Sequence, residues 1–145
     1  MAKAPYNSAM KFDLHCHSNA SDGKLTPAEV LSRVAASGVE LFALTDHDTL
    51  SGYAQIRHIT TNFTLVSGIE LSTVWSGVSV HVIGLDFDPD HPAMQEAITF
   101  LRNARAVRAQ VIAERLAQKG MPGALAGALG FCPDIGQVGR PHFAE

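Results

Sequence analysis

Two histidines near the start of the chain are the first residues whose spacing points to chemistry. His15 and His17 are separated by one residue in a strand-like segment. Side chains two positions apart on a strand face the same side of a sheet, and two imidazoles on one face can bind a metal ion. A single His-x-His pair is weak evidence by itself, so the interpretation depends on the residues that accompany it.

Further histidine and carboxylate side chains follow the next predicted strands. The candidate metal ligands are His15, His17, Asp22, His47, Glu70 and His81. Five of them lie at or just beyond predicted strand ends, where α/β folds gather their ligands, and His81 lies within a strand. A mixed set of histidines and carboxylates suits Zn, Mn or Fe better than Ca or Mg. Six ligands exceed the need of one tetrahedral zinc, so we expect two or three divalent ions, with Glu70 as a bridge.

A cluster of ions of this kind predicts phosphoester hydrolysis. Ions about 3.5–4 Å apart can make hydroxide from water at neutral pH and bind the phosphate oxygens. Such a reaction needs no serine or cysteine nucleophile. We therefore expect no catalytic side chain beyond the groups that hold the metal-activated hydroxide.

The elements that must position these residues alternate between strand and helix. A capping box at Thr26 and Glu29, with Pro27 at the first helical position, predicts a helix that stops at Gly38. Trp75-Ser76-Gly77 predicts the turn of a hairpin. The remaining predicted elements are strands at 11–16, 39–44, 63–71 and 78–87 and helices at 51–59, 92–119 and 124–129. This order predicts βαβ units and a mostly parallel sheet or barrel.

Several neighbours of the candidate ligands have supporting roles in this interpretation. Asp46, beside His47, is predicted to orient an imidazole from outside the first layer of ligands, and Asp13 is either a similar supporting acid or a satisfied buried one. Asp48 and Thr49 either cap the following helix or take part in catalysis. Cys16 is expected to be a small core residue.

Composition limits the classes of function. With 145 residues, 46% of them hydrophobic, the chain is one domain or a piece of a larger protein. A net charge of −3 argues against binding a long nucleic-acid duplex through a basic surface. Cys16 and Cys132 form no disulfide framework, and no signal peptide or long apolar run is visible, so we expect a cytoplasmic protein without a membrane span. Residues 1–9 are expected to be a loose leader, and no oligomeric state is predicted.

The ordered motifs resemble those of the PHP (polymerase and histidinol phosphatase) family between residues 11 and 88. They are Asp13-Leu14-His15-Cys16-His17, Ser21-Asp22-Gly23, Ala43-Leu44-Thr45-Asp46-His47-Asp48-Thr49, Gly68-Ile69-Glu70 and His81-Val82-Ile83-Gly84. The later Gly139-Arg140-Pro141-His142-Phe143-Ala144 resembles a motif of one subgroup. Its members are small bacterial phosphoesterases that dephosphorylate nucleoside 3′,5′-bisphosphates, and some also degrade short RNA from the 5′ end.

The resemblance implies an α/β fold, with residues 1–90 as the N-terminal part of a distorted seven-stranded PHP barrel and residues 91–145 as the start of a helical insertion, or cap. It implies a trinuclear centre, often manganese. In that centre His15, His17 and Glu70 hold one ion, Glu70 and His81 a second, and Asp22 and His47 a third. Arg140 and His142 either face substrate phosphate or ribose or form a purely structural turn.

The chain also departs from this subgroup. The resemblance implies proteins nearly twice as long, whose later half supplies another histidine ligand and an Asp-x-His pair. We therefore expect this chain alone to leave an open apolar edge and to lack full competence. The main hypothesis is a metal-dependent phosphoesterase acting on a nucleotide phosphomonoester; the alternative is a truncated or non-catalytic module that binds metal and phosphate without turnover. An amidohydrolase-type centre with a bridging lysine is disfavoured, since no lysine ends a middle strand.

Overall fold

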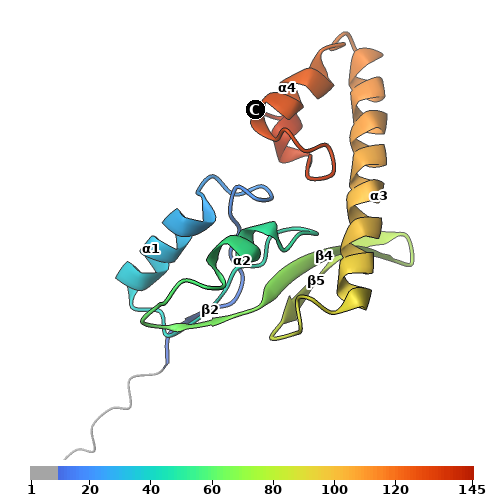
Figure 1. Cartoon of the computed structure of the whole chain (residues 1–145). Coiled ribbons are helices and arrows are strands. Elements are labelled where there is room, and N and C mark those ends of the chain that lie inside the picture. Colours follow the sequence, from blue (N-terminus) through green and yellow to red (C-terminus); the bar gives the residue numbers. More distant parts are fainter. Residues whose placement is uncertain (1–9) are drawn as a thin grey trace, which may run out of the picture.

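Three short parallel strands and an antiparallel hairpin form the strand framework of the computed structural model, which describes residues 10–145. The strands β1 (Phe12–Asp13), β2 (Leu41–Ala43) and β3 (Thr64–Val66) lie side by side in that order, all parallel. The hairpin consists of β4 (Gly68–Trp75) and β5 (Val78–Leu85). The predicted leader, residues 1–9, lies outside the described residues. Figure 1 shows the strands beneath α1 and α2, with the hairpin extending toward α3.

The helix α1 (Pro27–Ser37) begins and ends where the sequence predicts. Thr26 accepts a hydrogen bond from the Glu29 N–H at 3.3 Å, and the Glu29 carboxylate accepts one from the Thr26 N–H at 2.8 Å. Gly38 ends the helix at a φ of 73°, a left-handed conformation that glycine adopts without strain. One face of α1 packs on β2 in the main core, whose buried members are Val30, Leu31, Val34, Phe42, Leu44, Ile56 and Phe63.

The predicted strand at 63–71 is interrupted at Ser67, which separates β3 in the parallel sheet from β4 in the hairpin. The Ser67 hydroxyl donates to the Phe87 carbonyl at 2.6 Å and accepts from the Phe87 N–H at 2.8 Å. A Cβ on Gly68 would lie 2.7 Å from the Leu44 carbonyl oxygen, so only glycine allows this close approach. From there β4 pairs with β5 through the predicted turn, where Ser76 and Gly77 both have positive φ.

Most of the other elements are shorter than predicted at one or both ends, whereas the helix predicted at 124–129 extends to Phe131. The strands at 11–16 and 39–44 contract to β1 and β2, and the helix at 51–59 contracts to α2 (Ser51–Ile56). His15 and His17 therefore lie beyond their strand rather than within or at its end. Both histidines lie in a loop after β1. Contacts with neighbouring segments hold this loop in place, such as the hydrogen bond from the Thr45 N–H to the Cys16 carbonyl.

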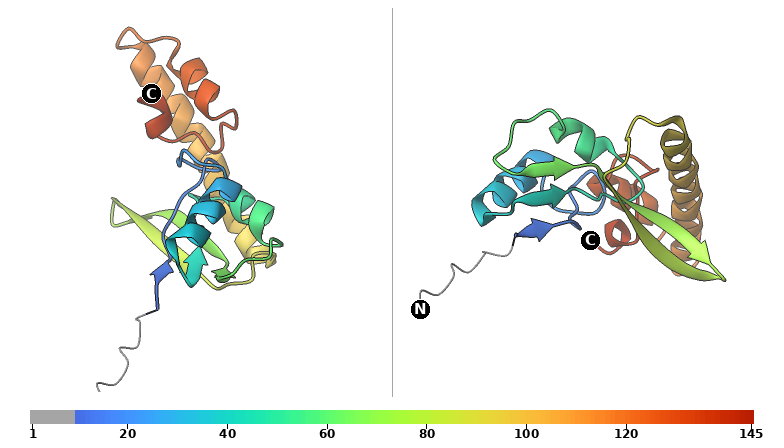
Figure 2. Two further views of the ribbon diagram at one scale, coloured as in Figure 1. Left: turned by 90° about the vertical axis from the view of Figure 1, so that its left-hand side faces the viewer. Right: turned by 90° about the horizontal axis from the view of Figure 1, so that it is seen from below.

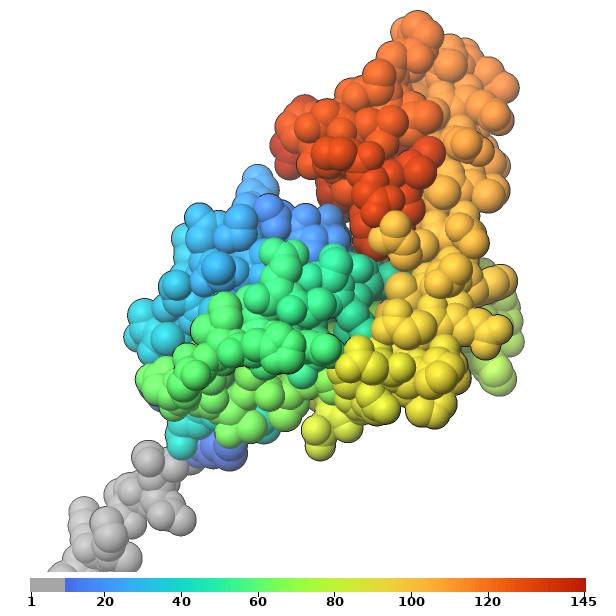
Figure 3. All heavy atoms as spheres, viewed as in Figure 1, coloured from blue at the N-terminus to red at the C-terminus, as the bar shows by residue number. Residues whose placement is uncertain are grey.

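Two helices and a short 3₁₀ turn make up the C-terminal third. They are α3 (Pro92–Ala117), α4 (Ala124–Phe131) and η1 (Pro141–Phe143). His91 caps α3 by accepting from the Ala93 N–H at 3.2 Å. A second core of Ala109, Ala128, Cys132 and Val138 joins α4 and the segment after it to α3. Figure 2 shows α4 folding back along α3, and Figure 3 shows the red C-terminal segment reaching down toward the blue N-terminal loop.

Apolar side chains are open on one face of the hairpin and on β1. Trp75 is 77% exposed, Val78 64% and Phe12 66%. Within residues 10–145, no helix is long and apolar enough to cross a membrane.

Candidate metal centre

The six candidate ligands converge, and the Glu70 carboxylate lies at their centre. Its Oε2 atom is 3.1 Å from His15 Nε2, 2.7 Å from His17 Nε2 and 3.5 Å from His47 Nδ1. Its Oε1 atom is 2.6 Å from His81 Nδ1. Four imidazoles from three separate segments thus face one buried carboxylate, the arrangement expected of a bridging ligand.

Asp22 completes the cluster on the side of His17 and His47. Its carboxylate lies 2.8 Å from His17 Nδ1 and 3.7 Å from His47 Nε2. The side chains form three overlapping groups that could each hold an ion: His15, His17 and Glu70; His17, Asp22 and His47; and His47, Glu70 and His81. The first group is the one that the resemblance implies. In the second group His17 joins the implied pair of Asp22 and His47, and in the third group His47 joins the implied pair of Glu70 and His81.

Backbone contacts across the strand ends bring these ligands together. The Thr45 N–H donates to the Cys16 carbonyl at 2.8 Å, which ties the segment of His15 and His17 to the segment after β2. His47 and Glu70 are paired in a parallel bridge. In the hairpin His81 lies directly opposite Ser72, and this places its side chain on the same face as Glu70.

Asp46 has a different role from the predicted one. No hydrogen bond joins it to an imidazole in the part of the chain that the structure describes. Its buried carboxylate instead accepts from the Ser18 N–H, the Ser18 hydroxyl and the Ser21 hydroxyl, each at 2.7 Å. Asp46 therefore shapes the loop between His17 and Asp22. Asp13 likewise contacts backbone, accepting from the His15 N–H at 3.4 Å.

Two imidazole nitrogens of the cluster lack a hydrogen-bond partner among residues 10–145. They are His17 Nε2 and His47 Nδ1, both buried and both directed at Glu70 Oε2 without the angle that a hydrogen bond requires. Buried polar atoms are rarely left without a partner. A divalent cation would satisfy both nitrogens and the carboxylate together, so the donor set fits a metal ion.

The charge states of the ligands favour a cation as well. The hydrogen bond from His17 lowers the pKa of Asp22 to about 2, and burial lowers the pKa of His47, so this imidazole is neutral and able to ligate at pH 7. Burial alone would raise the pKa of Glu70, but the hydrogen bonds with His15 and His81 outweigh burial and lower it.

Asp48 does not cap α2, contrary to one of its two predicted roles. Its side chain is fully buried, accepts from the Ser72 N–H at 2.7 Å and forms an ion pair with Arg105 of α3. Its backbone has a positive φ of 52°. Thr49 instead accepts from the Ser51 N–H at 3.1 Å, at the first residue of α2. Sequence reasoning missed the pairing of Asp48, for which the only signal was an arginine beside the apolar face of α3.

Gln137 links the C-terminal segment to the metal-binding edge. With its amide turned so that both ends are satisfied, its nitrogen donates to the His47 carbonyl at 3.2 Å and its oxygen accepts from Arg102 at 3.0 Å. Arg102 also pairs with Asp134 at 2.7 Å. Arg102 and Arg105 therefore hold the 134–140 segment and α3 against the backbone of a candidate ligand.

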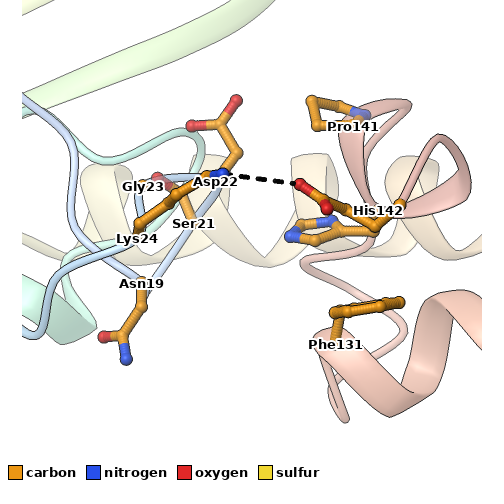
Figure 4. Close-up of a pocket in the computed structure, with 9 residues that line it drawn as sticks. Asn19, Ser21, Asp22, Gly23, Lys24, Phe131, Pro141 and His142 are labelled. Carbon is orange, nitrogen blue, oxygen red and sulfur yellow. Dashed lines mark ion pairs between the residues drawn. The ribbon is translucent and has the colours of Figure 1, made fainter.

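A cavity of about 390 Å³ separates the loop of Asp22 from the C-terminal segment. Figure 4 shows Asp22, Gly23 and Lys24 on one side and Phe131, Pro141 and His142 on the other. An ion pair between Lys24 and Glu145, at 3.9 Å, spans the cavity. His142 Nδ1 accepts from the Gly139 N–H at 2.9 Å, so the neutral ring carries its proton on Nε2. Arg140 is exposed and does not line this cavity.

A mixed α/β fold with a histidine and carboxylate cluster at strand ends is typical of metal-dependent hydrolases. The chain matches the sequence model of the PHP domain over residues 13–115, and it belongs to the PHP domain family.

Curated relatives resemble nearly the whole chain. It is 42% identical to the 5′-3′ exoribonuclease Rnm of Escherichia coli over 143 residues, covering 96% of this chain and 48% of the relative. It is 38% identical to the 3′,5′-nucleoside bisphosphate phosphatase of Chromobacterium violaceum, covering 92% of this chain and 47% of the relative. The chain thus spans about half the length of these relatives, which are named as hydrolases.

Solved structures share the fold. One from Chromobacterium violaceum, described as an amidohydrolase with bound sulfate and no metal, has a TM-score of 0.84 at 37% identity, covering 92% of this chain and 48% of that one. One from Bifidobacterium adolescentis, provisionally described as a metal-dependent phosphoesterase, has a TM-score of 0.81 at 30% identity, covering 94% of this chain and 49% of that one. In the present chain Lys11, Lys24 and Lys119 are all exposed, and none belongs to the histidine cluster.

Proposed function

We propose that this chain is the N-terminal part of a metal-dependent phosphoesterase that hydrolyses a nucleotide phosphomonoester. The substrate is a nucleoside 3′,5′-bisphosphate or the 5′ end of a short RNA. The observation that carries the proposal is the convergence of four histidines and Asp22 around Glu70, with two buried imidazole nitrogens facing the carboxylate and lacking a partner within the described chain. The names of the relatives support the substrate class.

The cluster would hold two or three divalent ions, manganese in our proposal, through His15, His17, Asp22, His47, Glu70 and His81. Such ions supply Lewis acidity and a nucleophile generated from water at neutral pH. The residues around the cluster keep it in shape. Asp46 holds the loop that carries Asp22, and Arg105 holds Asp48 next to His47.

Substrate contacts are proposed for Arg140 and His142. His142 lines the same cavity as Asp22, and its Nε2 proton is free to be donated to a phosphate or ribose oxygen. Arg140 adds positive charge at the adjoining turn. We also propose that residues 1–90 belong to a seven-stranded PHP barrel and that residues 91–145 begin a cap. The free thiols of Cys16 and Cys132 fit a cytoplasmic location.

The test is phosphate release from adenosine 3′,5′-bisphosphate by the protein expressed from its complete gene and loaded with Mn²⁺. We expect His47→Ala and Glu70→Ala to abolish phosphate release and to lower the bound metal measured by elemental analysis. His58→Ala is the matched control, since His58 is exposed and outside the cluster. Circular dichroism and a His47→Gln variant separate loss of ligation from loss of folding.

Two outcomes would contradict the proposal. Stoichiometric metal without phosphate release from any nucleotide would favour the non-catalytic module that binds metal and phosphate. Full activity in a folded His47→Ala protein would remove the cluster from the reaction altogether.

A further inference from the structure

The peptide group between His47 and Asp48 is held at both of its polar ends. Its N–H, from Asp48, donates to the Glu70 carbonyl at 2.9 Å. Its carbonyl, from His47, accepts from the Gln137 amide nitrogen at 3.2 Å. The bridge between His47 and Glu70 uses only the Asp46 carbonyl and the Asp48 N–H, so it leaves the His47 carbonyl free. Within residues 10–145, no group other than Gln137 donates to this carbonyl.

The backbone at this peptide group needs support from its surroundings. Asp48 has a φ of 52°, a left-handed conformation that is unfavourable for any residue other than glycine. Such a conformation persists only where neighbouring groups fix it. A rotation of the peptide group would also move His47, whose ring nitrogens lie 3.5 Å from Glu70 Oε2 and 3.7 Å from the Asp22 carboxylate. The hydrogen bond from Gln137 therefore bears on the position of a candidate metal ligand.

Gln137 is itself held firmly in place. It is 5% exposed, and its amide oxygen accepts from Arg102 at 3.0 Å. Its backbone N–H donates to the Asp134 carbonyl at 2.8 Å. The next residue, Val138, is 1% exposed and packs in the second core between α3 and α4. A buried amide that is bonded at both ends has one favourable orientation, so its contact with His47 is specific.

We propose that Gln137 is a positioning residue for His47, and that it couples the seating of the 134–139 segment to metal binding. This inference rests on the metal centre of the proposed function and deepens it. Groups outside the first layer of ligands tune metal affinity because they fix where the ligands lie. The coupling is reciprocal. A cation that holds the His47 imidazole also favours the backbone position to which Gln137 donates.

The test measures Mn²⁺ affinity by calorimetric titration of the protein expressed from its complete gene. Gln137→Glu removes only the bond to His47, because a carboxylate accepts hydrogen bonds and can still accept from Arg102. We expect it to raise the apparent Kd for Mn²⁺ by about 10-fold. Gln137→Met removes both bonds without adding a charge and should weaken binding at least as much. Gln110→Met changes an exposed glutamine of α3 and is the matched control, with unchanged affinity expected.

Arg102→Met separates positioning from general support of the fold. This variant keeps the amide donor of Gln137 but removes the contacts of Arg102 with Asp134 and with the amide oxygen. We expect Arg102→Met to lower the Tm of the metal-free protein more than Gln137→Glu does, and to weaken Mn²⁺ binding less. If Gln137 only supported the fold, the loss of affinity would follow the loss of Tm in both variants.

Hydrogen exchange of the 134–139 amides measures the coupling from the other side. In the wild type, Mn²⁺ should slow this exchange, whereas in Gln137→Glu it should have little effect. Wild-type Mn²⁺ affinity in a folded Gln137→Glu protein would overturn the inference, and so would wild-type exchange at 134–139 that does not respond to Mn²⁺. If no nucleotide is hydrolysed, the proposed function fails, but the difference in Mn²⁺ affinity still supports the role of Gln137.

Discussion

The buried ion pair between Arg105 and Asp48 joins α3 to the metal-binding edge, and replacing Arg105 by methionine tests its importance. Asp48 is 0% exposed and Arg105 7% exposed, so solvent cannot replace the lost partner. In the variant the Asp48 carboxylate keeps the hydrogen bond from the Ser72 N–H and loses its counter-charge. Removing one partner of a buried ion pair costs about 3–5 kcal/mol. We therefore expect Arg105→Met to lower the free energy of unfolding by about this amount.

The pH dependence of that loss follows from the sign of the pKa shift. Burial alone would raise the pKa of Asp48, but the Ser72 N–H and the charge of Arg105 outweigh burial and lower it. In the wild type, Asp48 therefore contributes stability above its unfolded value of 3.8, and this contribution is lost as the pH falls below it. Without Arg105, burial raises the pKa of Asp48. The difference in free energy of unfolding between wild type and variant is therefore largest near pH 7, and it shrinks as the Asp48 carboxyl becomes protonated.

Urea unfolding at pH 7 and pH 4.5 measures these changes on the protein expressed from its complete gene. A double-mutant cycle with Asp48→Asn isolates the pair, because the doubly substituted protein should lose less than the sum of the two single variants. Arg115→Met is the surface control, and its free energy of unfolding should stay within about 0.5 kcal/mol of the wild-type value. A loss below about 1 kcal/mol for Arg105→Met, or additive effects in the cycle, would refute the reasoning.

Two further predictions concern the loop that carries Asp22. Gly52→Ala places a methyl group against the Asp46 carboxylate, which is held by its hydrogen bonds to Ser18. We expect the free energy of unfolding to fall by about 1–3 kcal/mol and Mn²⁺ binding to weaken. The control Gly127→Ala adds a methyl group in open space on α4 and should be neutral or stabilising. Tolerance of Gly52→Ala would contradict the packing. In metal-free protein Asp22, with its pKa of about 2, contributes stability above pH 3.8 that is lost as the pH falls toward 2. The free energy of unfolding of Asp22→Asn should therefore fall less steeply with decreasing pH than that of the wild type. An unchanged pH dependence would mean that the hydrogen bond between Asp22 and His17 does not form.

The local signals in the sequence located several elements correctly. The capping box at Thr26, the glycine stop at Gly38 and the turn at Ser76 and Gly77 depend on a few neighbouring residues, so each is readable from a short segment. The split at Ser67 is different. It depends on a hydrogen-bonded contact with Phe87, twenty residues away, and on the close approach of Gly68 to Leu44, which no local pattern announces.

The sequence alone determined the kind of site and its candidate ligands. Their types, their order and their positions near strand ends identify a histidine and carboxylate cluster, because metal chemistry limits which side chains can serve. Only the tertiary structure decided how the ligands are held and what surrounds them. Asp46 binds serines rather than an imidazole, and Arg105 neutralises Asp48 from a helix 57 residues away. Burial and long-range charge set these pairings, and both arise only when distant segments pack together.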